Sequence, residues 1–244
     1  MVRSLFACSL IALGSLEAAQ LTWDADPATP GLQDGAGAWD DVQTNWWDGA
    51  ANTNWTRLPP DDATLGAGGT PGLITLGGPI SLGNLTFADA YVVTGSVLTL
   101  ASPSIVTATA AGVLGGSLAG GSLVKDGAAD LTLSAPNSFA GGLTVRAGRV
   151  VLGDDAAADG GTITLDGGSL LRNAAGAVVT NALVIGSSGT LAGRLVVDVY
   201  ATFAGPLSGG GPLAVTGLVS LANAGNAYTG AVTVRGGSFL RLAA

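Results

Sequence analysis

The sequence of 244 residues contains no histidine, a single cysteine and a single lysine. The absence of histidine removes the commonest general base, the Ser/His/Asp and Cys/His catalytic arrangements and the commonest metal ligand. Any catalytic mechanism would therefore depend on carboxylates, arginine, lysine or tyrosine.

Charge and large side chains are also scarce. Charged residues make up 11% of the chain, the net charge is -8 and the pI is near 4.1. A nucleic-acid surface needs clustered lysine and arginine, so we expect no nucleic-acid partner. Aromatic residues are 5% and glycines number 40, which means that small residues must pack against small residues. The hydrophobic content of 48% excludes a disordered chain.

The single cysteine, Cys8, lies in a segment that is typical of a secretory signal peptide. Arg3 precedes an apolar run over residues 5–13, and the small pair at 18–19 provides a cleavage region. We therefore predict a signal peptide at residues 1–19, too short to be a membrane anchor, and no membrane span in the mature chain. Cys8 precedes most of the apolar run, which disfavours lipidation. No disulfide framework or zinc site is available without cysteine.

Residues 63–244 consist of short runs such as LITLG, DLTLSA and LTVRAG, which alternate apolar and polar residues and end at Gly, Asn or Asp. This pattern predicts strands and turns, and it admits a sandwich, a barrel or a solenoid. Repeats favour the solenoid. NSFAGGLTVRAG at 137–148 returns as NAYTGAVTVRGG at 226–237, and LAGGSLVKDG at 118–127 is echoed by LSGGGPLAVTG at 207–217. Stacked coils place the same residues against the same neighbours, and roughly 20 to 25 residues per coil would give about nine coils.

The two copies, near residues 118–152 and 207–241, resemble the autotransporter-associated β-strand repeat, also called the passenger-associated transport repeat. GSLVKDG, LTLS, NSFAGG and LTVRAG match its lead, strand, turn and strand in order. The second copy departs from the pattern: Pro212 and Val215 stand where the leading Leu-Val and Lys125 would be, and VSLAN replaces LTLSA.

This resemblance implies an all-β, right-handed parallel β-helix passenger. Such a protein is handled by the bacterial export machinery and is secreted or displayed at the bacterial cell surface, with repeats that aid export and folding. Because the chain stops inside the second repeat, we expect it to be a piece of a longer protein.

An irregular cap is predicted at residues 20–62, which are rich in Asp, Asn and Gly and end at RLPPDD, a boundary or sharp turn. The open end of a solenoid needs bulky side chains to cover it. All the tryptophans of the chain lie in this segment: Trp23, Trp39, Trp46, Trp47 and Trp55. The alternative is a carbohydrate-binding module in which these rings stack on sugars.

Two acidic groups are candidate sites. The first is a calcium site formed by the aspartates of the cap segment, although their spacing does not fit an EF-hand: Asp24, Asp26, Asp34, Asp40, Asp41 and Asp48. The second is the loop GDDAAAD with Asp154, Asp155 and Asp159. A β-helical polysaccharide lyase or glycosidase needs paired carboxylates, and these aspartates could supply them. We favour solvated turn carboxylates in both cases.

The repeat itself suggests structural roles. Asn137, Phe139 and Gly141 are expected to shape a turn, with Val145 and Val234 buried and Arg146 and Arg235 pointing outward along one face of the rod. We therefore assign no catalytic, cofactor-binding or metal-binding residue. The sequence predicts a noncatalytic passenger-type stalk that acts in adhesion, with surface glycans or a host or neighbouring cell surface as its partner.

Overall fold

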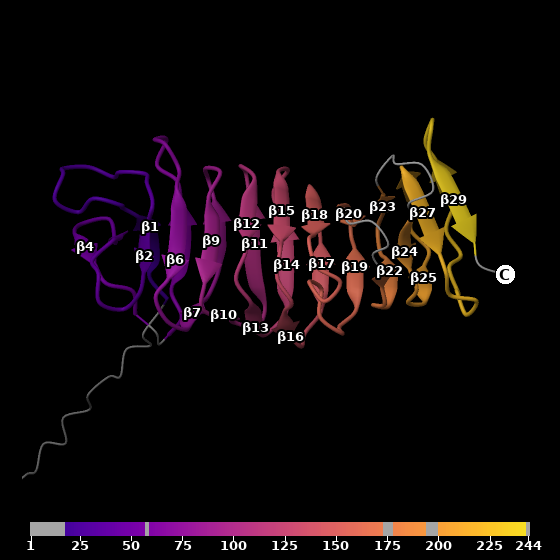
Figure 1. Ribbon diagram of the computed structural model, residues 1–244, viewed down its shortest axis with the longest axis horizontal. Coiled ribbons are helices and arrows are strands. Elements are labelled where there is room, and N and C mark those ends of the chain that lie inside the picture. Colours follow the sequence, from indigo (N-terminus) through magenta and orange to yellow (C-terminus); the bar gives the residue numbers. More distant parts are fainter. Residues whose placement is uncertain (1–17, 57–58, 173–177, 194–199, 243–244) are drawn as a thin grey trace, which may run out of the picture.

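The computed structural model of the protein describes residues 18–56, 59–172, 178–193 and 200–242. Across these residues the chain forms strands and turns but no helix, and the strands stack into a β-solenoid of about eight turns (Figure 1). The all-β class and the parallel solenoid are confirmed. The number of turns is one below the expected nine, because much of segment 20–62 forms loops of the cap instead of a coil.

Four sheets run along the rod. Sheet A contains β4 (Asn52–Thr53), β3 (Trp46–Trp47), β1 (Gln20–Trp23), β5 (Asp62–Leu65), β8 (Leu85–Phe87), β11 (Ser104–Ala108), β14 (Leu123–Asp126), β17 (Leu143–Val145), β19 (Ile163–Leu165), β22 (Leu183–Ile185) and β25 (Leu207–Gly209). Sheet B contains β2 (Gly37–Trp39), β6 (Leu73–Leu76), β9 (Val92–Gly95), β12 (Gly112–Leu114), β15 (Asp130–Leu133), β18 (Arg149–Leu152), β20 (Ser169–Arg172), β23 (Gly189–Ala192), β26 (Leu213–Thr216) and β28 (Val232–Val234). Sheet C contains β7 (Ile80–Leu82), β10 (Leu98–Leu100), β13 (Leu118–Gly120) and β16 (Ser138–Phe139), and sheet D contains β21 (Val178–Val179), β24 (Ala201–Phe203), β27 (Leu218–Leu221) and β29 (Phe239–Leu242).

Each complete coil visits sheet A, then sheet B, then sheet C or D. Neighbouring coils pair in parallel, and Leu123, Leu143, Ile163 and Leu183 lie directly above one another in sheet A. One coil in this part of the rod therefore takes about 20 residues, at the lower end of the range expected for a solenoid repeat.

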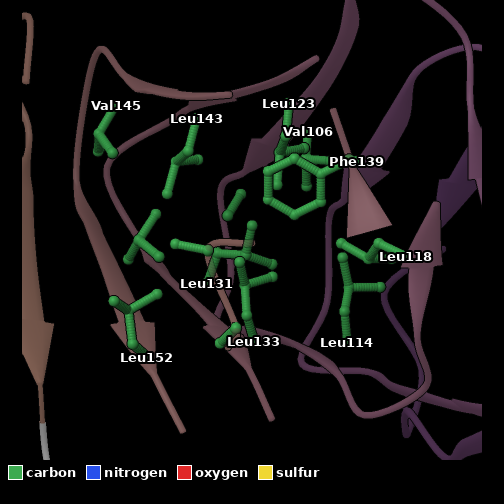
Figure 2. Packing of buried hydrophobic residues seen from close by; sticks show 14 of the residues in the cluster. Val106, Leu114, Leu118, Leu123, Leu131, Leu133, Phe139, Leu143, Val145 and Leu152 are labelled. Atoms are coloured by element: carbon green, nitrogen blue, oxygen red, sulfur yellow. The ribbon is translucent and has the colours of Figure 1, made fainter. Parts of the chain in front are cut away.

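Alternation along each strand sends every second side chain into the rod. Leu131 and Leu133 of β15 are fully buried while Thr132 between them is partly exposed, as the period of two predicts. Figure 2 shows leucine, valine and phenylalanine side chains from successive coils pointing toward one another in the interior. Burial of each such side chain contributes about 1.5–3 kcal/mol, so the fold depends on many equivalent small layers.

Glycine turns the chain between sheets A and B. Gly127 and Gly148 follow β14 and β17 at the same corner of successive coils, with positive φ values of 76° and 63°. A Cβ atom on Gly148 would lie 2.5 Å from the carbonyl oxygen of Gly127. These corners need glycine both for its backbone conformation and for the close stacking of the coils.

The N-terminal end of sheet A changes direction. β1 pairs in parallel with β5 but in antiparallel fashion with β3, and β3 and β4 form an antiparallel pair beyond it. This arrangement occupies the edge of β1 with strands from the Trp-rich segment (Figure 1). The division of the chain at residues 62 and 63 into cap and solenoid stays a prediction.

Candidate functional surface

Four of the five tryptophans form the interior of the cap. Trp23, Trp39 and Trp46 are 0% exposed and Trp55 is 1% exposed, and their ring centroids lie 4.7–5.3 Å apart in tilted or edge-to-face contacts. Aromatic pairs at these distances stabilise a core beyond the burial of their area. Sugar stacking on these four rings would require the cap to open; only Trp47 is partly exposed.

Two indole hydrogen bonds hold this cluster in place, one to the solenoid and one within the cap. The indole nitrogen of Trp55 donates to the carbonyl oxygen of Ser81 at 3.1 Å, and that of Trp23 donates to the carbonyl oxygen of Gly35 at 3.1 Å. The tryptophans therefore cover the first coils through both packing and directed contacts, which is the role expected of a cap.

The aspartates considered for calcium binding mostly accept hydrogen bonds from the backbone. Asp40 and Asp48 each accept from two N–H groups in their own turns, and the side chain of Asp26 accepts from Ala28. Buried Asp24 accepts from the backbone N–H groups of Asp26 and Gln33 and from the side chain of Asn52. Within the described residues, no group of three or more carboxylate, histidine or cysteine side chains is placed to hold a metal ion. The geometry supports the turn role.

Asp34 has a different role, which the sequence did not reveal. Its carboxylate accepts a hydrogen bond from the hydroxyl group of Tyr91 at 2.7 Å and others from the backbone N–H groups of Ala67 and Gly69. Burial alone would raise the pKa of Asp34, but these hydrogen bonds outweigh it and lower the pKa below its usual value. Burial and the bond to Asp34 raise the pKa of Tyr91. This cluster joins the cap loop to the turn after β5 and to the residue before β9.

The acidic loop after β18 is used for local structure. Asp154 accepts a hydrogen bond from the backbone N–H of Ala156, and Asp155 forms an ion pair with Arg172 at 2.6 Å. Asp159 adopts a positive φ of 51° in the same loop. Asp155 is thus paired with buried Arg172 and Asp154 bonds to the backbone of its own loop, which is the use expected of turn carboxylates.

The repeated asparagine joins successive coils, as expected for a structural turn residue. The side-chain oxygen of Asn137 accepts from the backbone N–H of Leu118 at 2.7 Å, and its amide nitrogen donates to the carbonyl oxygen of Ala157 at 2.6 Å. In the second copy the side-chain oxygen of Asn226 accepts from the backbone N–H of Leu207 at 2.8 Å. Both copies thus use this residue for the same bond to the preceding coil.

Lys125 is buried in an inward column of sheet A, between Val106 and Val145. Its ammonium group donates to the carbonyl oxygens of Asp126 and Gly127 at 2.7 Å and of Ala147 at 3.2 Å. Burial lowers the pKa of Lys125, and the nearby carboxylates of Asp126 and Asp130 oppose that shift. Lys125 therefore joins the A–B corners of two successive coils from inside the rod.

The expectation that Arg146 and Arg235 line one face of the rod is wrong. Arg146 follows β17 in sheet A, whereas Arg235 follows β28 in sheet B. In the first copy the Asn-aromatic segment forms β16 in sheet C, and in the second copy residues 227 and 229 bond to β25 of sheet A. The repeats are not separated by a whole number of coils, so equivalent residues reach different faces.

Burial at the second copy also differs from the expectation. Val145 is 0% exposed as expected, whereas Val234 is 44% exposed. Val234 pairs in register with buried Val215, so it continues an inward column, but it lies in the last coil that the structure describes. The direction predicted for its side chain is confirmed, and the predicted burial is wrong.

The two repeat copies are also the part of the chain that matches a known protein family. The family model described as Passenger-associated-transport-repeat matches residues 123–152 and 216–239, which hold the two strand–turn–strand units and the asparagines described above. The chain carries passenger-associated transport repeats. This confirms the resemblance carried by GSLVKDG, LTLS, NSFAGG and LTVRAG.

A curated relative extends this similarity beyond the repeats. The chain is 30% identical over 243 residues to the Adhesin BmaC autotransporter of Brucella suis biovar 1 (strain 1330), and the match includes 95% of this chain. The chain spans only 7% of the length of that relative. No solved structure matches the chain. Among the described residues, no helix is long and apolar enough to cross a membrane.

Proposed function

We propose that this chain is a noncatalytic, passenger-type β-helical stalk that is secreted or displayed at the bacterial cell surface and acts in adhesion. The observation that carries the proposal is the continuous parallel pairing of coils from β5 to β28 in sheets A and B, which builds a rod (Figure 1). Alternation along the strands places every second side chain on its outer faces. A rod of this kind holds a contact surface away from its point of attachment, which is a mechanical and interfacial task.

Adhesion is supported by the relative that is described as an adhesin and an autotransporter. The similarity includes 95% of this chain, so most of the rod and the cap lies in the common region. We propose surface glycans or the surface of a host or neighbouring cell as the partner. The proposed signal peptide, residues 1–19 with Cys8, lies almost entirely outside the described residues.

Export and folding fit the architecture of the repeats. Each coil forms its backbone hydrogen bonds and buries its side chains mainly against the preceding and following coils. A chain that leaves the bacterial export machinery as an extended polypeptide can therefore fold coil by coil, because each finished coil offers a strand edge to the next. Asn137 and Lys125 strengthen these steps, since both connect one coil to its neighbour.

A noncatalytic role is supported by how the acidic groups are used. The carboxylates of the cap accept turn hydrogen bonds, and Asp155 of the acidic loop is paired with Arg172. No specific observation in the described residues favours polysaccharide cleavage or sugar stacking on the buried tryptophans.

Display on a non-adherent bacterium tests the proposal. Residues 20–244 are fused to a translocating β-barrel, and surface exposure is measured by the release of a folded fragment with external protease. We expect several times more bacteria bound to cultured host cells than with the barrel alone. A folded, surface-exposed rod that increases binding no further than the barrel alone would contradict the role in adhesion.

A further inference from the structure

A hollow of about 370 Å³ lies on the outer face of sheet B, toward the C-terminal end of the rod, where β23 is labelled in Figure 1. Ser188, Thr190, Thr233 and Arg235 are among the residues that line it, and their side chains carry three hydroxyl groups and a guanidinium group. Pro212 and Ala214 supply apolar surface between these polar groups. The volume falls within the range of sites that take a small molecule or one unit of a larger one.

The hollow is supported by the regular part of the fold. Thr190, Ala214 and Thr233 lie side by side in three neighbouring strands, in direct register. The residues next to them, Leu191 and Val215, point inward and are 0% exposed. The outward side chains are therefore held on a packed sheet, and the small side chain of Ala214 leaves room between the two threonines.

Arg235 stands out from the other cations in the part of the chain that the structure describes. Arg149 and Arg172 form ion pairs with Asp130 and Asp155, and Lys125 bonds to three carbonyl groups. The guanidinium group of Arg241 bonds to Ser220 and lies 4.7 Å from the ring centre of Tyr200.

Arg146, the counterpart of Arg235 in the first repeat copy, has a carboxylate nearby. Hydrogen bonds from Ser187 lower the pKa of Asp166, and the charge of Arg146 adds a smaller lowering effect. Arg235 is exposed and makes no ion pair or side-chain hydrogen bond with any described residue, and none of the residues that line the hollow with it is acidic.

This set of groups matches one chemical class of ligand. A free guanidinium binds a carboxylate through charge-assisted hydrogen bonds, often two at once. Three hydroxyl groups can exchange hydrogen bonds with the hydroxyls of a sugar ring, and the faces of Pro212 and Ala214 can contact its C–H groups. A lone phosphate or sulfate would use Arg235 but would leave most of the 370 Å³ unfilled.

We propose that this hollow binds the carboxylate-bearing pyranose unit of an acidic surface glycan, with Arg235 holding the carboxylate. The inference rests on the proposed adhesive function and gives it a ligand class. Because the chain carries a net charge of -8, an acidic glycan is repelled elsewhere on the rod, and binding depends on this unpaired arginine.

The matched pair of repeat arginines provides the test. Binding of a sialylated oligosaccharide, a galacturonic acid oligosaccharide and a neutral oligosaccharide of equal length is measured by calorimetry with residues 20–244. Arg235→Gln should weaken binding of the acidic ligand about tenfold or more, equivalent to about 1.4 kcal/mol. Arg146→Gln, at the same repeat position on another face, should leave the affinity unchanged.

A second variant separates shape from charge. Ala214→Leu fills the hollow with an outward side chain on a strand face and keeps Arg235, and it should weaken binding to a similar extent while the melting temperature stays near that of the wild type. The preferred acidic ligand identifies the source of the sugar, sialylated or uronic. Equal affinity for the neutral ligand, displacement by an equal concentration of inorganic phosphate, or equal losses in Arg235→Gln and Arg146→Gln would each overturn the inference.

The two proposals fail in different experiments. If the displayed rod binds cells but the purified rod does not bind acidic oligosaccharides, adhesion stands and the hollow is not its site. If purified protein binds the acidic ligand through Arg235 but displayed rods do not bind cells, the hollow is a site and the adhesive function is wrong.

Discussion

Single polar side chains connect neighbouring coils from inside or at the corners of the solenoid. Asn137, Asn181 and Asn226 each bond to backbone groups of another coil, and Lys125 does so from an inward column. In a solenoid each such contact fixes the stacking of one coil on the next. A buried backbone group that loses its partner costs free energy, so these side chains are more important for stability than their number suggests.

Asn137→Leu should lower the free energy of unfolding by about 1–3 kcal/mol, because the backbone N–H of Leu118 and the carbonyl oxygen of Ala157 both lose a buried partner. Urea denaturation followed by circular dichroism gives the change. Ser134→Ala, at an exposed position whose hydroxyl bonds to no described residue, is the control and should stay within about 0.5 kcal/mol of the wild type. An unchanged denaturation midpoint in Asn137→Leu would show that its hydrogen bonds do not stabilise the coil.

Lys125→Met should also destabilise the rod near neutral pH, by about 1–3 kcal/mol, because three carbonyl oxygens lose their donor while the aliphatic volume is kept. The pKa of Lys125 is lowered in the folded state, so the unfolded chain holds this proton more tightly. Wild-type stability should therefore rise with pH between the lowered pKa and the usual lysine value, and this rise should be absent in Lys125→Met. Denaturation curves across that pH range measure the difference; identical pH profiles for the two proteins would contradict it.

At the scale of the element, the cap is attached to the solenoid by side chains from separate segments. The buried tryptophans pack over the first coils, and Asp34 bonds to Tyr91 and to the backbone at Ala67 and Gly69. The tryptophan ring contacts are apolar and do not change with pH, whereas the Asp34 cluster needs an ionised carboxylate. Acid should therefore loosen the cap through Asp34 while the ring cluster is left chemically unchanged.

Asp34→Asn tests this attachment. The pKa of Asp34 is lowered in the folded state, so its contribution to stability is complete above the unfolded pKa near 3.8 and is lost as pH falls through the lower, folded value. At pH 7 the variant should be less stable by about 1–2 kcal/mol, allowing for partial exposure, and this part of the acid dependence should vanish. Tryptophan fluorescence during denaturation reports on the cap directly.

Asp26→Asn is the matched control, because the carboxylate of Asp26 bonds only within its own loop, to Ala28 and Thr29. It should keep the acid dependence of the wild type. If Asp34→Asn and Asp26→Asn have the same acid profile, the Asp34 cluster does not attach the cap.

The period of two along the strands allowed many of the strands of the solenoid to be predicted from the sequence. LTLS and LTVRAG alternate with a period of two, and the structure buries Leu131, Leu133, Leu143 and Val145 accordingly. The Trp-rich cap was also predictable, because the bulky rings gather in one segment next to the first coil, where the solenoid has an open end that needs to be covered. The contact of Asp34 with Tyr91 was not, since it joins residues 57 positions apart through loops without periodicity.

At the scale of the whole molecule, the face reached by each repeat depends on the lengths of all the coils between the copies. The repeat pattern fixes which neighbour Asn226 contacts, but not whether its segment lies beside sheet A or sheet C. Small differences in coil length add up along the rod and rotate the second copy relative to the first. For this reason the sequence predicted the local role of the repeat correctly and the alignment of Arg146 with Arg235 wrongly, and it did not reveal the hollow.

The stacked architecture predicts how the rod opens. Each coil is stabilised by two neighbours except at the ends, so opening should begin there and cost the most in the middle. In a purified segment of residues 20–244 the N-terminal end is covered by the cap, whereas β28 and β29 form the last coil of the segment and expose Val232, Val234, Phe239 and Leu242. Amide hydrogen exchange should therefore be slowest in β11 to β18 and fastest in β28 and β29, by about tenfold or more at neutral pH, which corresponds to about 1.4 kcal/mol of local opening free energy.

Trp46→Ala sharpens this prediction because it removes a fully buried ring from the cap without touching the other end. Loss of a buried tryptophan costs about 3–5 kcal/mol, so β1 and β5 should lose protection. β23 and β26 should keep their exchange rates, because several coils separate them from the cap and opening propagates only between neighbours. Equal acceleration in all coils would mean that the rod unfolds as one cooperative unit, and folding coil by coil during export would then lose its physical basis.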